Sequence, residues 1–169
     1  MDLQQYELLA ELFKYPCEDF HKGLSLSLAV LQKKYPVAAQ ELQKFSDHLK
    51  PKGLEHIGEL YTRSFEIQAI TTLDVGYVLF GDDYKRGEIL SNLVREHESV
   101  QNDCGIQLAD HLPNLLCLMV KHKDFEFITD LVREILAPAL KQMIDEFEPQ
   151  RIHQKNELYK KQYKTIIET

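Results

Sequence analysis

Apolar residues recur three and four positions apart along almost the whole chain, and this period constrains the fold more than any other feature of the sequence. The clearest case is the segment Leu54–Phe65, whose apolar side chains fall at positions that share one face of a helix. Each such segment must bury its apolar face against a neighbour, so the sequence predicts an all-α, multi-helix bundle. The same period predicts further helices over residues 3–13, 23–34, 36–49, 82–101, 111–120 and 124–147.

At three places in the sequence, the apolar period alone does not determine the predicted structure. Between Ile70 and Phe80, β-branched and aromatic residues would also suit a buried strand, but the short length and the helical neighbours favour a short buried helix. The run Leu115–Val120 is apolar on all sides of a helix, which predicts a position at the centre of the fold. Pro138 interrupts the longest helical pattern, so we expect a kink or a break there.

The length of the chain, 169 residues, suits a single domain. Glycine and proline together account for only 13 residues, which disfavours disorder and turn-rich β folds. We expect an all-helical domain over residues 1–149. Residues 150–169, after Pro149, carry five basic and two acidic residues and form either a loosely docked last helix or a partly ordered tail.

The formal net charge is −7, which is the wrong sign for a protein that grips nucleic acid or an anionic membrane. Residues 55–110 hold eleven acidic and four basic residues and thus carry this entire excess. A basic partner segment would suit such a surface, although a solvated acidic face remains the alternative. No apolar run is long enough to insert into a membrane, and the three cysteines form no C-x-x-C pair. We therefore expect a cytoplasmic protein.

Sequence patterns typical of catalysis are absent. There is no H-E-x-x-H, no G-x-S-x-G and no glycine-rich phosphate loop, and the two Glu-x-x-His pairs that a di-metal helix-bundle site requires are not present. The nearest approach to a metal-ligand pattern is Glu55-His56-x-x-Glu59 on one helix. The sequence therefore predicts neither an enzyme nor a bound metal or cofactor.

Three short elements stand out, in this order: Tyr61–Glu66, Gly81–Gly87 and Leu108–Pro113. Together they resemble the NarJ/TorD-type redox-enzyme maturation chaperones, whose pattern is Y-x-x-x-F-acid, then G-D-x-R-x-R-G, then L-P-D-H-L-P. The similar region spans about Leu54–Leu116. Three ordered elements at similar separations are more specific than any one of them.

The chain departs from this pattern at Tyr84 and Ala109, where an arginine and a proline are expected, and these departures bear on the choice of client. The resemblance implies an all-helical chaperone, acting as a monomer or weak dimer. It would bind the N-terminal segment of a molybdopterin oxidoreductase catalytic subunit, often a twin-arginine signal peptide or its remnant, and hold the subunit for cofactor insertion and assembly or export. The alternative is a non-catalytic helical adaptor or permanent accessory subunit of a redox complex. The predicted client-binding residues are Tyr61, Phe65, Glu66, Asp74, Asp82, Asp83, Arg86, Asp110, His111 and Leu112.

Several of these residues also suit a structural role. Asp82 or Asp83 is expected to cap the helix that follows, and Asp110 to cap the central helix, which leaves client binding as the alternative for each. Arg86 is expected to form an ion pair inside the fold, with Glu66 or another carboxylate. Tyr61 and Phe65 of the first element pack either in the core or along the wall of a groove. His111 of the third element either forms hydrogen bonds inside the fold or changes the affinity for the peptide near neutral pH.

Overall fold

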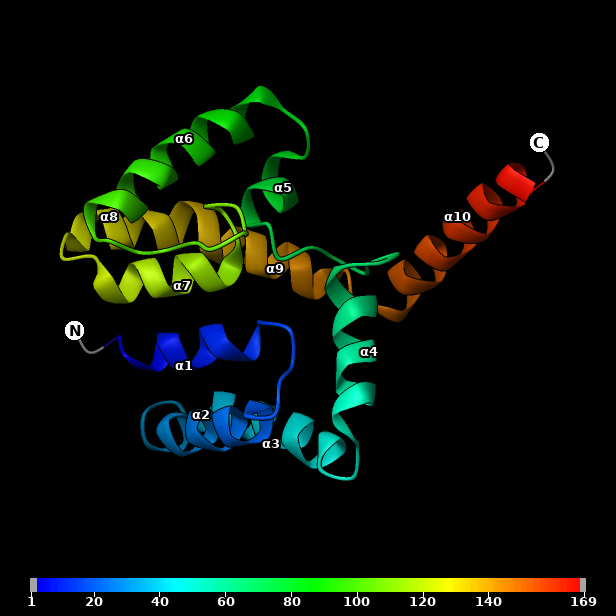
Figure 1. Ribbon diagram of the computed structural model, residues 1–169, viewed down its shortest axis with the longest axis horizontal. Helices are drawn as coiled ribbons and strands as arrows, with labels where there is room; N and C mark the ends of the chain where they lie inside the picture. Colours follow the sequence, from blue (N-terminus) through cyan, green and yellow to red (C-terminus); the bar gives the residue numbers. More distant parts are fainter. Residues whose placement is uncertain (1–2, 168–169) are drawn as a thin grey trace.

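Every segment with the helical period forms a helix in the computed structural model, which describes residues 3–167, with side chains to residue 161 (Figure 1). Within this range no strand is formed, and the only extended pairing is an isolated bridge between Asp74 and His111. The predicted all-α bundle is confirmed. The elements are α1 (Gln5–Leu12), α2 (Phe20–Lys34), α3 (Pro36–Leu49), α4 (Leu54–Phe65), α5 (Val75–Phe80), α6 (Tyr84–Ser99), α7 (Leu112–Lys121), α8 (Phe125–Asp130), the π-helical turn η1 (Leu131–Leu136), α9 (Ala137–Asp145) and α10 (Pro149–Ile167).

Helix α7 lies at the centre of the fold, as its all-apolar composition predicted. Leu115 and Leu118 have no exposed surface, and the side chains around them come from α1, α6, α8 and α9. On one side of α7, α1 lies alongside it and α2 and α3 follow as the next layer (Figure 1). On the other side lie α5, α6 and the long helical stretch α8–η1–α9.

Helix α4 crosses the ends of these layers and joins the α2–α3 pair to the opposite side of the molecule (Figure 1). Its buried Ile57 joins a second, smaller core with Phe20, Leu24 and Leu49. Its last turn, with Tyr61 and Phe65, packs against the main core. The apolar stripe of α4 therefore links the two cores.

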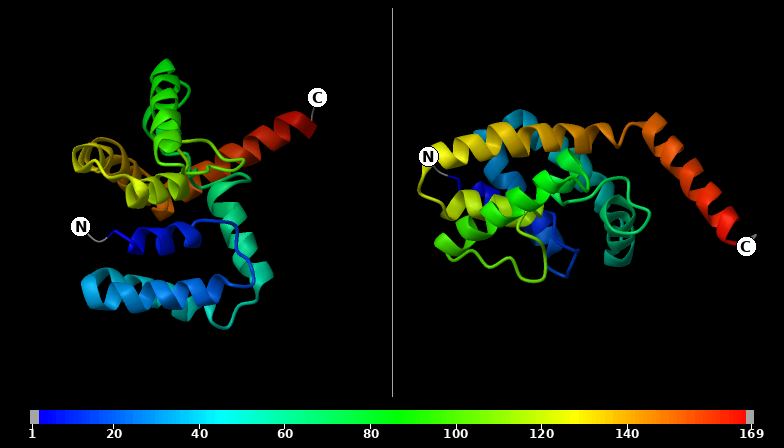
Figure 2. Two further views of the ribbon diagram at one scale, coloured as in Figure 1. Left: turned by 60° about the vertical axis from the view of Figure 1, so that its left-hand side comes forward. Right: turned by 90° about the horizontal axis from the view of Figure 1, so that it is seen from above.

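A kink or a break was predicted at Pro138; of these two, the break does not occur, because the stretch α8–η1–α9 continues through Pro138 as one helical run (Figure 2). Instead, the turn before the proline is π-helical, which gives room for a ring that would clash with the preceding turn of a regular helix. Not every apolar residue of these helices is buried: Ile144 on α9 and Val94 on α6 are exposed.

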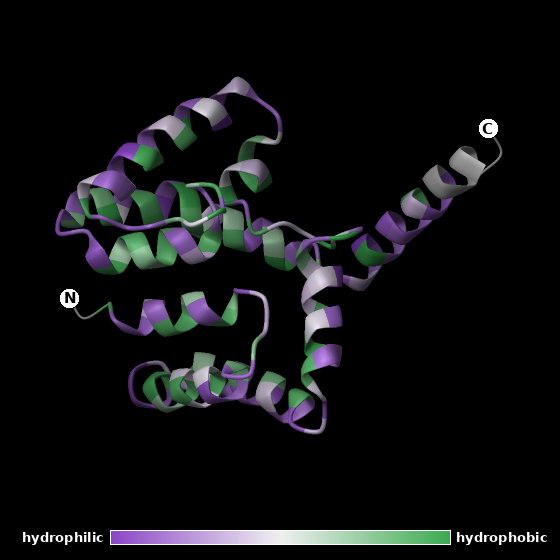
Figure 3. Cartoon of the chain, in the orientation of Figure 1, coloured by the Kyte–Doolittle hydropathy of each residue, from purple (hydrophilic) through white to green (hydrophobic). Residues whose placement is uncertain are grey.

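Helix α10 begins at Pro149 and points away from the body (Figures 1 and 2). Polar residues predominate along its coloured part, whereas apolar residues predominate along α7 (Figure 3). The C-terminal segment forms this helix as far as residue 167, and the prediction for residues 168–169 lies outside the described residues. Across residues 3–167, no helix is both long and apolar enough to cross a membrane.

Candidate functional site

The second and third sequence elements meet where α5, α6 and the start of α7 converge. The bridge between Asp74 and His111 aligns the two connecting segments. Leu112 N donates to Leu73 O at 2.8 Å, and Val75 N donates to Asp110 O at 3.0 Å. These backbone bonds bring ionisable side chains from three places in the sequence into one group, which we call the ionic cluster: Asp74, Arg86, Asp110 and His111.

Arg86 bridges the two acidic residues of the ionic cluster. Its Nε donates to Asp110 Oδ2 at 3.1 Å and its Nη2 to Asp74 Oδ2 at 3.2 Å. The side chain is only 17% exposed, and its guanidinium lies over the Tyr77 ring, 5.2 Å from the centroid. The predicted internal ion pair is thus present, but its partners are these two aspartates and not Glu66.

Asp110 is fully buried, and its position corrects its predicted role as the cap of α7. The N-cap position of α7 is His111, and no side-chain cap bond is formed there. Asp110 Oδ2 instead accepts from Gly76 N at 3.1 Å, in the first turn of α5. Asp110 thereby satisfies the start of a helix 34 residues earlier in the chain.

The close approach of Asp110 to α5 requires a glycine at position 76. A Cβ atom at this position would lie 2.6 Å from Asp110 Oδ2 and 3.4 Å from Arg86 Cγ. No side chain fits there without displacing the ionic cluster.

His111 completes the cluster, because its Nδ1 lies 3.0 Å from Asp74 Oδ1. The hydrogen bond with His111 lowers the pKa of Asp74 against the effect of burial, and the charge of Arg86 lowers it further. Asp74 thus remains a carboxylate held by two partners.

A second polar network, which the sequence did not predict, fixes the segment leading to the third element. The buried His97 places Nε2 3.0 Å from Ala109 O and Nδ1 2.8 Å from Asn102 Nδ2. A carbonyl can only accept, so Nε2 carries the proton and Asn102 donates to Nδ1. Burial lowers the pKa of His97, which keeps the ring neutral. No motif marks these two residues, which become partners only through the fold.

The first sequence element lines an apolar pocket of about 370 Å³ formed by residues of α1, α2, α3 and α4 together with Phe147. We call it the apolar pocket. Phe65 lies edge-on to both Tyr61 and Phe147, with ring centroids 5.3 and 6.4 Å apart. Tyr61 OH donates to Phe13 O at 3.2 Å, and burial raises the pKa of Tyr61. Both aromatic residues of the motif thus contact the core and also form part of the pocket wall.

The remaining predicted site residues lie outside both groups. Glu66 follows α4 and accepts a hydrogen bond from Thr62 Oγ1 at 3.2 Å. Asp83 caps α6 by accepting from Lys85 N at 2.9 Å, as predicted for one of the two aspartates, while Asp82 is exposed beside it. Leu112 is buried in the core. The ten predicted residues therefore do not form one surface.

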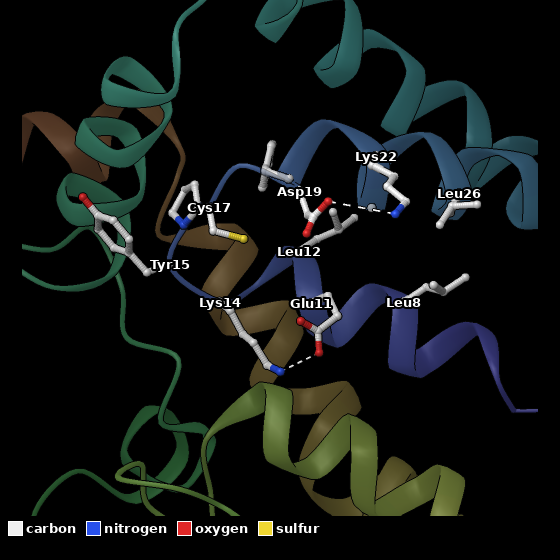
Figure 4. Close-up of a pocket in the computed structure, with 12 residues that line it drawn as sticks. Leu8, Glu11, Leu12, Lys14, Tyr15, Cys17, Asp19, Lys22 and Leu26 are labelled. Atoms are coloured by element: carbon white, nitrogen blue, oxygen red, sulfur yellow. Dashed lines mark hydrogen bonds and ion pairs between the residues drawn. The ribbon is translucent and has the colours of Figure 1, made fainter.

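A further pocket of about 350 Å³ lies beside the apolar pocket, between α1 and α2 (Figure 4). Its rim carries two exposed ion pairs, Glu11 with Lys14 and Asp19 with Lys22. No pattern in the sequence predicted this pocket. The two pockets share three wall residues, Leu12, Pro16 and Phe20.

The described residues include no group of three or more histidine, cysteine, aspartate or glutamate side chains that could hold a metal ion. The chain matches no model of a protein family, no curated protein and no solved structure. The resemblance to the NarJ/TorD-type chaperones thus rests on the three sequence elements alone.

Proposed function

We propose that this protein is a cytoplasmic, non-catalytic chaperone of the NarJ/TorD type. In this proposal it binds the N-terminal segment of a molybdopterin oxidoreductase catalytic subunit, which combines arginines with apolar residues, and holds the subunit during cofactor insertion and assembly or export. The resemblance in sequence supplies the class of client.

The observation that carries the proposal is the apolar pocket. Its wall is almost wholly apolar, and Phe45 and Phe147 at its edge are 45% and 40% exposed. Open apolar surface of this kind marks binding sites for apolar segments of partners. Tyr61 and Phe65, the aromatic residues of the first sequence element, form part of the same wall.

The charged residues of the ionic cluster have a different role in this proposal. Asp74, Arg86 and Asp110 bind one another, so they position α5 and α6 and do not receive the client's arginines. The exposed acidic residues of segment 55–110 would accelerate encounter with a basic client.

Titration calorimetry of the full chain tests the proposal. The ligands are N-terminal peptides of the molybdoenzyme catalytic subunits encoded in the same genome, each with an arginine-to-alanine version. One-to-one binding that weakens without the arginines would support the chaperone function. If no peptide binds the folded protein and the chain co-purifies stoichiometrically with a mature enzyme, it is instead an accessory subunit.

A further inference from the structure

The junction between α9 and α10 places a carboxylate next to the wall of the apolar pocket. Phe147 belongs to that wall and lies edge-on to Phe65. Glu146 directly precedes it, and 25% of its side chain is exposed. A peptide whose apolar side chain enters the pocket near Phe147 would bring a neighbouring basic residue within reach of Glu146.

Two basic residues of α10 form ion pairs with Glu146 in this structure. Arg151 Nη1 lies 2.6 Å from Oε1, and Lys155 Nζ lies 2.8 Å from Oε2. The hydrogen bond from Lys155 lowers the pKa of Glu146 against the effect of burial, and Arg151 lowers it further. Each carboxylate oxygen thus has its own cationic donor.

Two further hydrogen bonds join α10 to the segment that follows α4. Lys155 Nζ also donates to Ile70 O, and Tyr159 OH donates to Ala69 O at 3.3 Å. Farther along, α10 points away from the body (Figures 1 and 2). Because these attachments are polar contacts of partly exposed side chains, a ligand of the same chemistry can replace them.

We propose that Glu146 receives a basic side chain of the client, and that α10 competes for it through Arg151 and Lys155. This inference rests on the proposed function. In the free protein α10 satisfies the carboxylate. A client that fills the apolar pocket and offers an arginine displaces the two α10 residues from Glu146. The competition lowers the apparent affinity for basic clients, because only the fraction of molecules with Glu146 released can bind them fully. A client without the basic residue leaves α10 in place.

The test uses calorimetry of the full chain with a synthetic peptide that carries an Arg-Arg pair before an apolar segment, and the same peptide with Ala-Ala. The double variant Arg151→Gln/Lys155→Gln removes the competing cations. We expect it to bind the Arg-Arg peptide about threefold to tenfold more tightly than the wild type and the Ala-Ala peptide equally well. Lys160→Gln/Lys161→Gln is the matched control, since it makes the same change in net charge on α10, away from Glu146, and should alter neither affinity by more than the general charge effect.

Glu146→Gln gives the complementary result. It removes the carboxylate, so we expect the Arg-Arg peptide to bind no more tightly than the Ala-Ala peptide. In both Glu146→Gln and Arg151→Gln/Lys155→Gln, amide hydrogen exchange over residues 150–160 should accelerate while exchange in α7 is unchanged, which shows α10 released from a folded body.

Two results would overturn the inference. If the Arg-Arg peptide binds more tightly than the Ala-Ala peptide to the wild type and keeps that advantage in Glu146→Gln, the client's arginine binds elsewhere and the proposed function survives alone. If neither peptide binds any of the folded variants, the proposed function fails and this inference fails with it.

Discussion

The ionic cluster, which draws on the second and third sequence elements, and the apolar pocket, which draws on the first, use their side chains in opposite ways. In the ionic cluster, Asp74, Arg86, Asp110 and His111 bind one another and are mostly withdrawn from solvent. In the apolar pocket, aromatic side chains line an opening that no part of the described chain fills. The charged side chains of the ionic cluster thus hold helices of the fold together, whereas the aromatic side chains of the apolar pocket line open space.

Removing Asp110 should have the largest effect. Asp110→Ala leaves Arg86 without its buried partner and Gly76 N without its acceptor. We expect a loss of about 3 to 5 kcal/mol in the free energy of unfolding, measured by chemical denaturation. The matched control is Asp82→Ala, which removes an exposed carboxylate from the second sequence element and should change stability by less than about 0.5 kcal/mol. Equal effects of the two substitutions would contradict the structural role of the cluster.

Filling the space at Gly76 should also damage the cluster. Gly76→Ala forces Asp110 Oδ2 away from a Cβ at 2.6 Å, and we expect about 1 to 3 kcal/mol of destabilisation. Gly87→Ala is the control, because Gly87 lies within α6, a Cβ added there would meet no atom within 4 Å, and alanine favours helix. It should stabilise the protein by about 0.5 to 1 kcal/mol. Thermal melts of the two variants should therefore shift in opposite directions.

Changing the rim of the pocket should weaken binding and leave the fold intact. Phe45→Ser removes a half-exposed ring from the pocket wall, and we expect about tenfold weaker binding of the client peptide with little change in melting temperature. Phe125→Ser removes a similarly exposed ring on α8, away from the pocket, and should leave affinity unchanged. Equal loss of affinity in both variants would place the contact elsewhere.

Mild acid should lower the free energy of unfolding gradually. The pKa of His97 lies below its usual 6.5 in the folded protein because the ring is buried, so the unfolded chain binds a proton first. The contribution of the neutral His97 ring to the free energy of unfolding is fully present above pH 6.5. It decreases as the pH falls towards the lowered pKa, by at most about 1.4 kcal/mol per pH unit. Denaturation midpoints measured from pH 8 to pH 5 should decline in the wild type and decline less in His97→Gln. An identical decline in both proteins would show that other groups control this range.

The helices were predictable because their signal is local. The apolar period of α4 and the all-apolar run of α7 each determine which faces must be buried, and the structure agrees in both places. The aspartate pair before α6 likewise predicted the position of the N-cap of this helix to within one residue.

The partners of the charged residues were not predictable from the same pattern. Asp110 joins Arg86 from 24 residues away and Gly76 from 34 residues away, and no spacing rule connects such positions. The position of Asp110 just before α7 favoured an N-cap role, but its side chain bonds to Gly76 and Arg86 instead. The apolar pocket could not be predicted from the sequence either, because a stripe of aromatic residues has the same pattern whether a neighbouring helix covers it fully or leaves part of it open.

The most direct test of this account is amide hydrogen exchange of the full chain with and without a bound molybdoenzyme N-terminal peptide. We expect slower exchange in the segments around the apolar pocket, residues 9–13, 42–49 and 57–65, and faster exchange at the start of α10. Exchange at residues 74–86 and 108–112, which hold the ionic cluster, should stay unchanged. Protection confined to those last two segments would contradict the account, because the charged motif residues would then be the contact surface and the pocket would not.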